Sequence, residues 1–112
     1  MSDFCPFCQR IESGQYDLPI GGDGEVVSFE PLAPVTPGHR LFLPRRHAAD
    51  VTADITLTRM TFGQAAIYGA TRNEDFNLIA SVGPAATQTI DHLHVHYVPR
   101  RPDDGLRLPW TD

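Results

Sequence analysis

Residues 91–101 read DHLHVHYVPRR, and three of the five histidines of the chain stand here at every second position. Side chains at positions i, i+2 and i+4 of a β-strand point to the same face of the sheet. Residues 89–99 are therefore predicted to form a strand with His92, His94 and His96 on one face and the apolar side chains on the other. Three adjacent imidazoles do not suit a hydrophobic core, because every buried ring nitrogen needs a partner. The row of three histidines therefore predicts a functional site.

Two other interpretations of the row stay open at this point. A solvent-facing edge strand could carry three histidines without any functional role. All three could also bind one metal ion, but a strand rise of about 3.3 Å per residue separates the outer two by about 13 Å at the backbone. Metal–nitrogen bonds are close to 2 Å. We therefore expect the three histidines to have different roles.

The rest of the chain predicts one α+β domain over residues 1–112. Residues 26–29 and 39–43 have the pattern of two strands joined by a proline-rich connection. The main helix is expected from about residues 54–56 to 70, although Gly63 weakens it and Gly69 indicates its end. Residues 76–81 have the pattern of a further strand. Prolines are expected to keep residues 99–112 an irregular tail.

The composition excludes several classes of function. The formal net charge is −5 and the chain contains no lysine, so a basic face for duplex nucleic acid is not expected. No apolar run approaches the roughly 20 residues of a membrane-spanning helix, and the N-terminus lacks the pattern of a signal peptide. We therefore expect a cytoplasmic protein that does not act at a membrane.

Both cysteines belong to one Cys-x-x-Cys motif, CPFC at residues 5–8. In a cytoplasmic protein this spacing indicates zinc binding or dithiol chemistry. The redox motif of glutaredoxins would follow a first strand, and four preceding residues leave no room for one. Two cysteines supply half of a tetrahedral zinc site, so His47 and one member of the histidine row are candidates for the other half. Two inert reduced thiols are the alternative.

These features together resemble the histidine triad (HIT) family, in particular its zinc-containing Hint-like branch. The motif H-x-H-x-H followed by apolar residues, the upstream TPGH and P-x-x-H, and the N-terminal Cys-x-x-Cys carry the resemblance, which runs from Cys5 to about Arg101. It implies an antiparallel sheet meander with one main helix and a short N-terminal helix. It also implies a homodimer whose sheet continues across the interface.

The resemblance further implies hydrolysis or transfer of a nucleotidyl group through a covalent histidine intermediate. His94 would attack the α-phosphorus, and His96 would stabilise the phosphate and the leaving group. His39, in TPGH, would orient them, although a plain structural role for His39 is nearly as well supported. A structural zinc ion is expected to be held by Cys5, Cys8, His47 and His92.

The substrate-binding positions implied by the resemblance are Gln88, Thr89, Ser81, Phe29 and Leu32. The expected substrate is a nucleoside phosphoramidate or a dinucleoside polyphosphate. Two departures concern the nucleoside, because Pro31 stands where many members have an acidic residue and Ser81 where they often have asparagine. They motivate an alternative, a nucleotide-binding or scaffold protein with little turnover.

Overall fold

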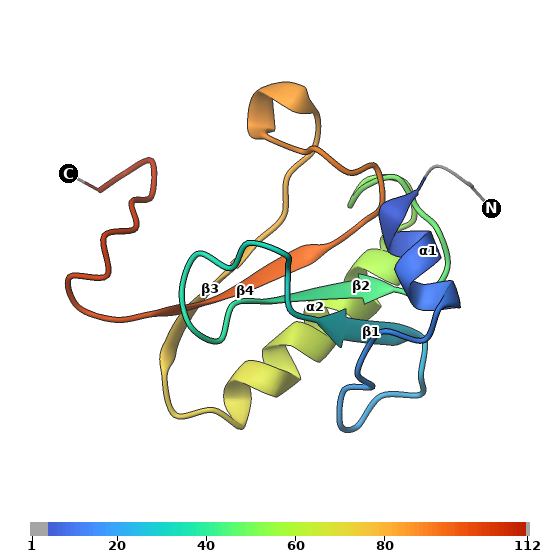
Figure 1. The fold of residues 1–112 in the computed structure, drawn as a ribbon, viewed down its shortest axis with the longest axis horizontal. Coiled ribbons are helices and arrows are strands. Elements are labelled where there is room, and N and C mark those ends of the chain that lie inside the picture. Colours follow the sequence, from blue (N-terminus) through green and yellow to red (C-terminus); the bar gives the residue numbers. More distant parts are fainter. Residues whose placement is uncertain (1–4, 112) are drawn as a thin grey trace.

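The computed structural model describes residues 5–111 and confirms the α+β fold class (Figure 1). Two α-helices and a four-stranded antiparallel sheet make up the domain. In chain order the elements are α1 (Pro6–Glu12), β1 (Val26–Phe29), β2 (Arg40–Pro44), α2 (Ile55–Ala70), β3 (Asp75–Ile79), the 3-10 helix η1 (Pro84–Ala86) and β4 (Val95–Arg100).

The last strand lies inside the sheet, not at its edge. The strand order is β1-β2-β4-β3, so β4 separates β2 from β3 and the order is not that of a simple meander. The connection that contains α2 leads from β2 past the site of β4 to the edge strand β3. His96 pairs with Leu41 of β2 on one side and with Ile79 of β3 on the other. Continuation of the sheet into a dimer through an edge stays a prediction.

The helix α2 runs along one face of the sheet, and the short helix α1 lies near one end of β1 and β2 (Figure 1). Alternation along β2 divides the core, because Leu41 and Leu43 pack with α1 whereas Phe42 packs on the side of α2. The core on the α1 side also contains Phe7, Ile11, Val27 and Phe29. The core on the α2 side contains Val26, Ala65, Val95 and Tyr97.

The two helices begin at side-chain caps. Asp54 precedes α2 and its carboxylate accepts the backbone N–H of Leu57 at 3.1 Å. Cys5 precedes α1, and its Sγ accepts the backbone N–H of Cys8 at 3.3 Å. The predicted end of α2 at residue 70 is confirmed, since the helix ends at Ala70. Gly69, in the last turn, allows the close approach of Phe76 of β3, whose ring a Cβ would overlap.

The strand boundaries were predicted well except for the last strand. Residues 92–94 were expected within it, but β4 begins only at Val95. The reason is a tertiary contact: the backbone N–H of Leu93 donates to the carbonyl of Ala48 at 2.6 Å, so this stretch follows the loop after β2 instead of entering the sheet. Pro99 lies inside β4 opposite Phe76, and residues 101–111 contain neither helix nor strand.

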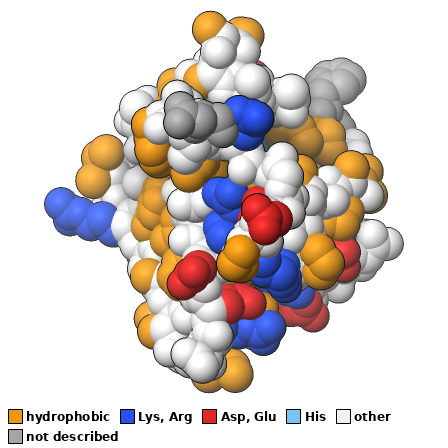
Figure 2. Space-filling view, turned by 90° about the vertical axis from the view of Figure 1, so that its left-hand side faces the viewer, with side chains coloured by type: hydrophobic (Ala, Val, Ile, Leu, Met, Phe, Trp, Pro, Cys, Tyr) orange, Lys and Arg blue, Asp and Glu red, His pale blue; other side chains and the backbone are white. Residues whose placement is uncertain are grey.

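Acidic and basic side chains are interspersed on the face seen in Figure 2, with hydrophobic side chains around them. Several arginines of the chain are paired, such as Arg100 with Asp104 at 2.8 Å. Among the described residues, no helix is long and apolar enough to cross a membrane.

We predict opposite effects of alanine at two glycines of α2. Gly69→Ala should lower the free energy of unfolding by about 1–3 kcal/mol, because the added methyl group overlaps the Phe76 ring. Gly63→Ala is the matched control, since a Cβ there meets nothing within 4 Å. It should raise the free energy of unfolding by about 0.5–1 kcal/mol. Urea unfolding measures both, and equal stabilisation by the two substitutions would contradict the packing at Gly69.

Candidate functional site

Four predicted ligand residues from distant parts of the chain lie together at one end of the sheet. Cys5, Cys8, His47 and His92 bring their ligand atoms within 4.8 Å of one another. The Nδ1 of His92 is 3.4 Å from the Sγ of Cys5 and 3.5 Å from the Sγ of Cys8. The Nδ1 of His47 is 3.3 Å from the Sγ of Cys8.

These separations fit a tetrahedral metal site. Zinc bonds of about 2.3 Å to sulfur and about 2.0–2.1 Å to nitrogen place neighbouring sulfur and nitrogen ligands about 3.5 Å apart. Cys5 immediately precedes α1 and Cys8 lies in its first turn. His47 comes from the loop after β2, and His92 from the approach to β4. The cluster could therefore hold a metal ion and would then join three segments of the chain.

The surroundings of His92 favour metal binding through Nδ1. The ring is fully buried, and its Nε2 lies 2.9 Å from the carbonyl oxygen of Pro44. Because a carbonyl only accepts, Nε2 carries the proton and donates, which leaves the Nδ1 lone pair facing the cysteines. Burial lowers the pKa of His92 to about 4, so the ring is neutral near pH 7.

A cysteine must lose its proton to bind a metal ion, whereas a neutral imidazole binds as it is. Burial first, and then the hydrogen bond and charge of Cys5, raises the pKa of the Cys8 thiol to about 11. A divalent cation reverses this balance, because it stabilises the thiolate and releases the proton. Without a cation, the raised pKa makes the Cys8 thiol a poor nucleophile, so dithiol redox chemistry through Cys8 is not favoured.

His94 is held in the tautomer that a nucleophile requires. Its Nδ1 lies 2.7 Å from the backbone carbonyl oxygen of His92 and must donate a proton to it. The Nε2 nitrogen therefore keeps its lone pair. Burial lowers the pKa of His94, which favours the neutral ring. Phe7 of α1 packs edge-on against the His94 ring at 5.1 Å between centroids and fixes its orientation.

A chain of three hydrogen-bonding groups fixes His96 as a donor. The backbone N–H of Val35 donates to Nδ1 of His39 at 3.1 Å, so the proton of a neutral His39 is on Nε2. That Nε2 is 2.9 Å from Nδ1 of His96 and donates to it. His96 consequently carries its own proton on Nε2. Burial, followed by the charges of His94 and His39, lowers the pKa of His96 to about 4.

The arrangement combines a lone pair and a donor on adjacent rings. The centroids of His94 and His96 are 5.2 Å apart. A neutral nitrogen nucleophile beside an N–H donor suits an electrophile that bears negatively charged oxygens, such as a phosphate ester or amide. The sequence indicated these histidines, but not Phe7 or the backbone groups of Val35 and Pro44, which act through atoms that carry no side-chain signal.

The five residues predicted to contact substrate differ in burial and in hydrogen bonding. The Gln88 amide is engaged by backbone groups: Oε1 accepts the N–H of Gly83 in the same loop at 2.9 Å, and Nε2 donates to the carbonyl of Ala49, in the segment after β2, at 2.8 Å. Phe29 is buried against Phe7, whereas Leu32 is 99% exposed. Thr89 is exposed and Ser81 is half-buried. Substrate binding by these five positions stays a prediction.

Comparison with known proteins places the fold and the histidine motif in one family. Residues 14–103 match the HIT domain family. An uncharacterised HIT-like protein of Mycobacterium tuberculosis is 36% identical over 112 residues, covering 93% of this chain and 76% of that protein. The adenosine 5′-monophosphoramidase of Schizosaccharomyces pombe is 26% identical, covering 95% of this chain and 82% of that protein.

A solved structure agrees with the sequence comparisons. A protein of Streptococcus mutans with 28% sequence identity superposes with a TM-score of 0.79, covering 100% of this chain and 75% of that one. The antiparallel sheet with its histidine segment thus defines a HIT protein. This chain belongs to the HIT family, and its Cys-x-x-Cys near His47 and His92 is consistent with the zinc-binding branch.

We predict that the purified protein carries about one metal ion per chain, as measured by elemental analysis. Cys8→Ser and His47→Ala should lose most of it, because three ligands bind far more weakly than four. His94→Ala is the matched control, because it also removes a histidine from this region. The His94 ring is hydrogen-bonded to a backbone carbonyl and is not one of the four candidate ligands, so this variant should retain the metal. A folded native protein without metal would contradict the assignment of the cluster.

Proposed function

We propose that this HIT protein is a nucleotidyl hydrolase or transferase in which His94 forms a covalent nucleotidyl-histidine intermediate. The observation that carries the proposal is the 2.7 Å hydrogen bond from Nδ1 of His94 to the carbonyl of His92, which leaves Nε2 unprotonated. Family membership supports nucleotide chemistry in general. The adenosine 5′-monophosphoramidase of the fission yeast supports a P–N bond at the α-phosphate as the bond that is cleaved.

In the first half of the proposed reaction, the Nε2 lone pair of His94 bonds to the α-phosphorus. The P–N or P–O bond to the leaving group breaks, and the leaving group departs with that electron pair and takes a proton from water. His96 is neutral near pH 7, because its pKa is lowered to about 4 by burial. Its Nε2–H therefore acts as a hydrogen-bond donor to the phosphoryl oxygens.

In the second half, a water oxygen bonds to phosphorus and the bond between phosphorus and Nε2 breaks. The electron pair returns to Nε2 of His94, and the proton of the water passes to solvent. The net reaction consumes one water and yields a nucleoside monophosphate. His39 would act on this step indirectly, because it holds His96 in the donating tautomer.

We infer that the metal is zinc and that its role is structural. Two thiolates and two imidazoles are the ligand set that zinc prefers, and four protein ligands leave no position for substrate. Bound zinc supplies a fixed crosslink between α1, the loop after β2 and the approach to β4. His92 links this crosslink to the proposed nucleophile. Its ring is one of the four candidate ligands, and its carbonyl oxygen accepts the hydrogen bond from Nδ1 of His94.

A second candidate function is nucleotide binding, or a scaffold role, with little turnover. The amide of Gln88 is engaged by backbone groups, and Ser81 is shorter than the asparagine expected there. Both reduce the donors available to a bound nucleotide. Binding and catalysis use the same histidines, so turnover itself has to be measured.

We predict that His94→Ala abolishes hydrolysis of an adenosine phosphoramidate without changing the fold or the metal content. Comparison of the hydrolysis rates of nucleoside phosphoramidates and dinucleoside polyphosphates identifies the preferred leaving group. Rapid acid quenching followed by mass spectrometry of the native enzyme should reveal a nucleotidyl adduct on His94 that the variant lacks.

Normal turnover by His94→Ala would remove His94 from the proposed role. Tight nucleotide binding by the native protein, with neither turnover nor adduct, would favour the binding function.

A further inference from the structure

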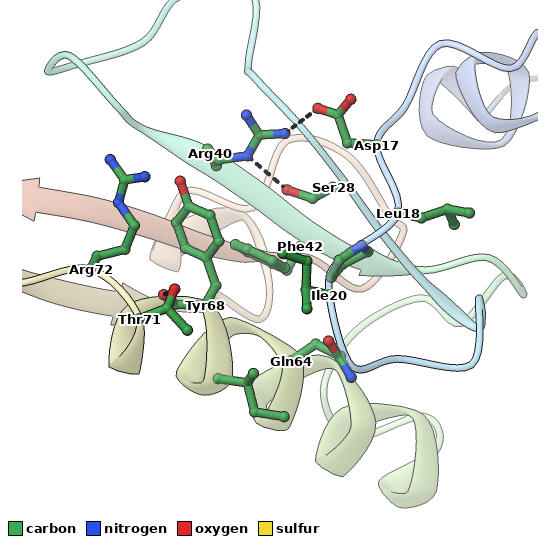
Figure 3. Close-up of a pocket in the computed structure, with 12 residues that line it drawn as sticks. Asp17, Leu18, Ile20, Ser28, Arg40, Phe42, Gln64, Tyr68, Thr71 and Arg72 are labelled. Atoms are coloured by element: carbon green, nitrogen blue, oxygen red, sulfur yellow. Dashed lines mark hydrogen bonds and ion pairs between the residues drawn. The ribbon is translucent and has the colours of Figure 1, made fainter.

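A separate cavity of about 420 Å³ is shown in Figure 3. It lies on the α2 side of the sheet, whereas His96 pairs with Leu41, whose side chain packs on the α1 side. The cavity is bounded by α2, by β1 and β2, and by the segment that leads into β1. Phe42 lines it on the α2 side of β2, whereas Leu41 and Leu43 next to it point toward α1. A cavity of this size accepts a small organic ligand. None of the five histidines lines it.

The middle of the cavity is apolar and aromatic. Phe42 and Tyr68 form one wall, with ring centroids 5.3 Å apart. Ile20 and Ile67 line it as well, and they are 89% and 45% exposed. Exposed aliphatic side chains beside an open aromatic wall favour burial of a flat apolar body.

One end of the cavity holds an unsatisfied acceptor. Gln64 extends from α2 toward Ile20 in Figure 3. Its Oε1 is buried and has no hydrogen-bond partner among the described residues. A buried acceptor without a partner is costly, so this atom is a natural contact for an N–H or O–H group of a ligand.

The other end carries hydrogen-bond donors, two of them cationic. In Figure 3 the Tyr68 side chain reaches up from α2 toward Arg40 and Arg72. Arg72 pairs with Glu74 only at 3.6 Å, and Glu74 already accepts the hydroxyl of Tyr97 at 2.8 Å. The guanidinium donors of Arg72 are therefore poorly used.

Arg40 also keeps donors for a ligand. Its Nε donates to Ser28 at 3.0 Å and one Nη to Asp17 at 2.6 Å. The second Nη has no hydrogen-bond partner among residues 5–111, and the Asp17 side chain is 74% exposed, which makes that ion pair weak. A guanidinium has five N–H groups, so Arg40 can add a carboxylate or phosphate without losing its present bonds.

We propose that this cavity binds a small organic anion with a flat apolar body and a hydrogen-bond donor at the end remote from its charge. The anionic group contacts Arg40, Arg72 and the Tyr68 hydroxyl, the body lies along Phe42, and the donor reaches Oε1 of Gln64. Gln64 and Tyr68 are one helical turn apart on α2, about 6 Å, and Arg72 follows the end of the helix, so the two polar ends lie at different positions along α2.

The test compares three ligands on the unaltered protein by NMR titration. Para-hydroxyphenylpropanoate has both polar ends, phenylpropanoate lacks the donor, and para-hydroxyphenylpropanamide lacks the charge. A ligand of this size should bind with a Kd on the order of 1 mM. We expect roughly fivefold weaker binding without the donor and about tenfold weaker binding without the charge.

Variants assign the two ends. Arg72→Gln should weaken binding of para-hydroxyphenylpropanoate about tenfold but leave binding of the uncharged amide unaffected. Gln64→Leu should make para-hydroxyphenylpropanoate bind no more tightly than phenylpropanoate. Arg59→Gln, an exposed arginine elsewhere on α2, is the control and should change nothing. Absence of binding by all three ligands, equal binding of all three, or equal effects of Arg59→Gln and Arg72→Gln would overturn the proposal.

Discussion

A backbone group or a neighbouring ring determines which nitrogen of each central histidine carries the proton, and the chemistry of the site depends on that constraint. The carbonyl of Pro44 accepts a hydrogen bond from Nε2–H of His92, and the carbonyl of His92 accepts one from Nδ1–H of His94. The N–H of Val35 orients His39, which in turn orients His96. In every case the opposite nitrogen is left with a defined function, either as a lone pair or as a donor.

His92 connects the group of four candidate metal ligands with the proposed nucleophile. Its ring faces the two cysteines, and its carbonyl holds the ring of His94, so one residue contributes to both sites. This double role explains why residues 92–94 leave the regular strand. A residue paired in the sheet commits its backbone groups to the ladder, whereas here the His92 carbonyl is available for an imidazole. The bond from Leu93 to Ala48 stabilises the departure.

Much of this arrangement could be predicted from the sequence. The fold class, the helix α2 and the four cluster residues follow from periodicity, from motif spacing and from the family resemblance. The start of β4 could not be predicted, because alternation continues through residues 92–98 and only a tertiary hydrogen bond interrupts the pairing. The role of Gly69 was also hidden, since its close approach to Phe76 depends on packing between distant segments. No sequence motif predicts the cavity beside Gln64.

The tautomers of the histidines can be measured by long-range nitrogen–proton NMR correlation on protein with labelled imidazoles near pH 7. We predict a neutral His94 with its proton on Nδ1, and neutral His92 and His96 rings with their protons on Nε2. A His94 ring protonated on Nε2, or on both nitrogens, would have no lone pair for phosphorus and could not be the nucleophile.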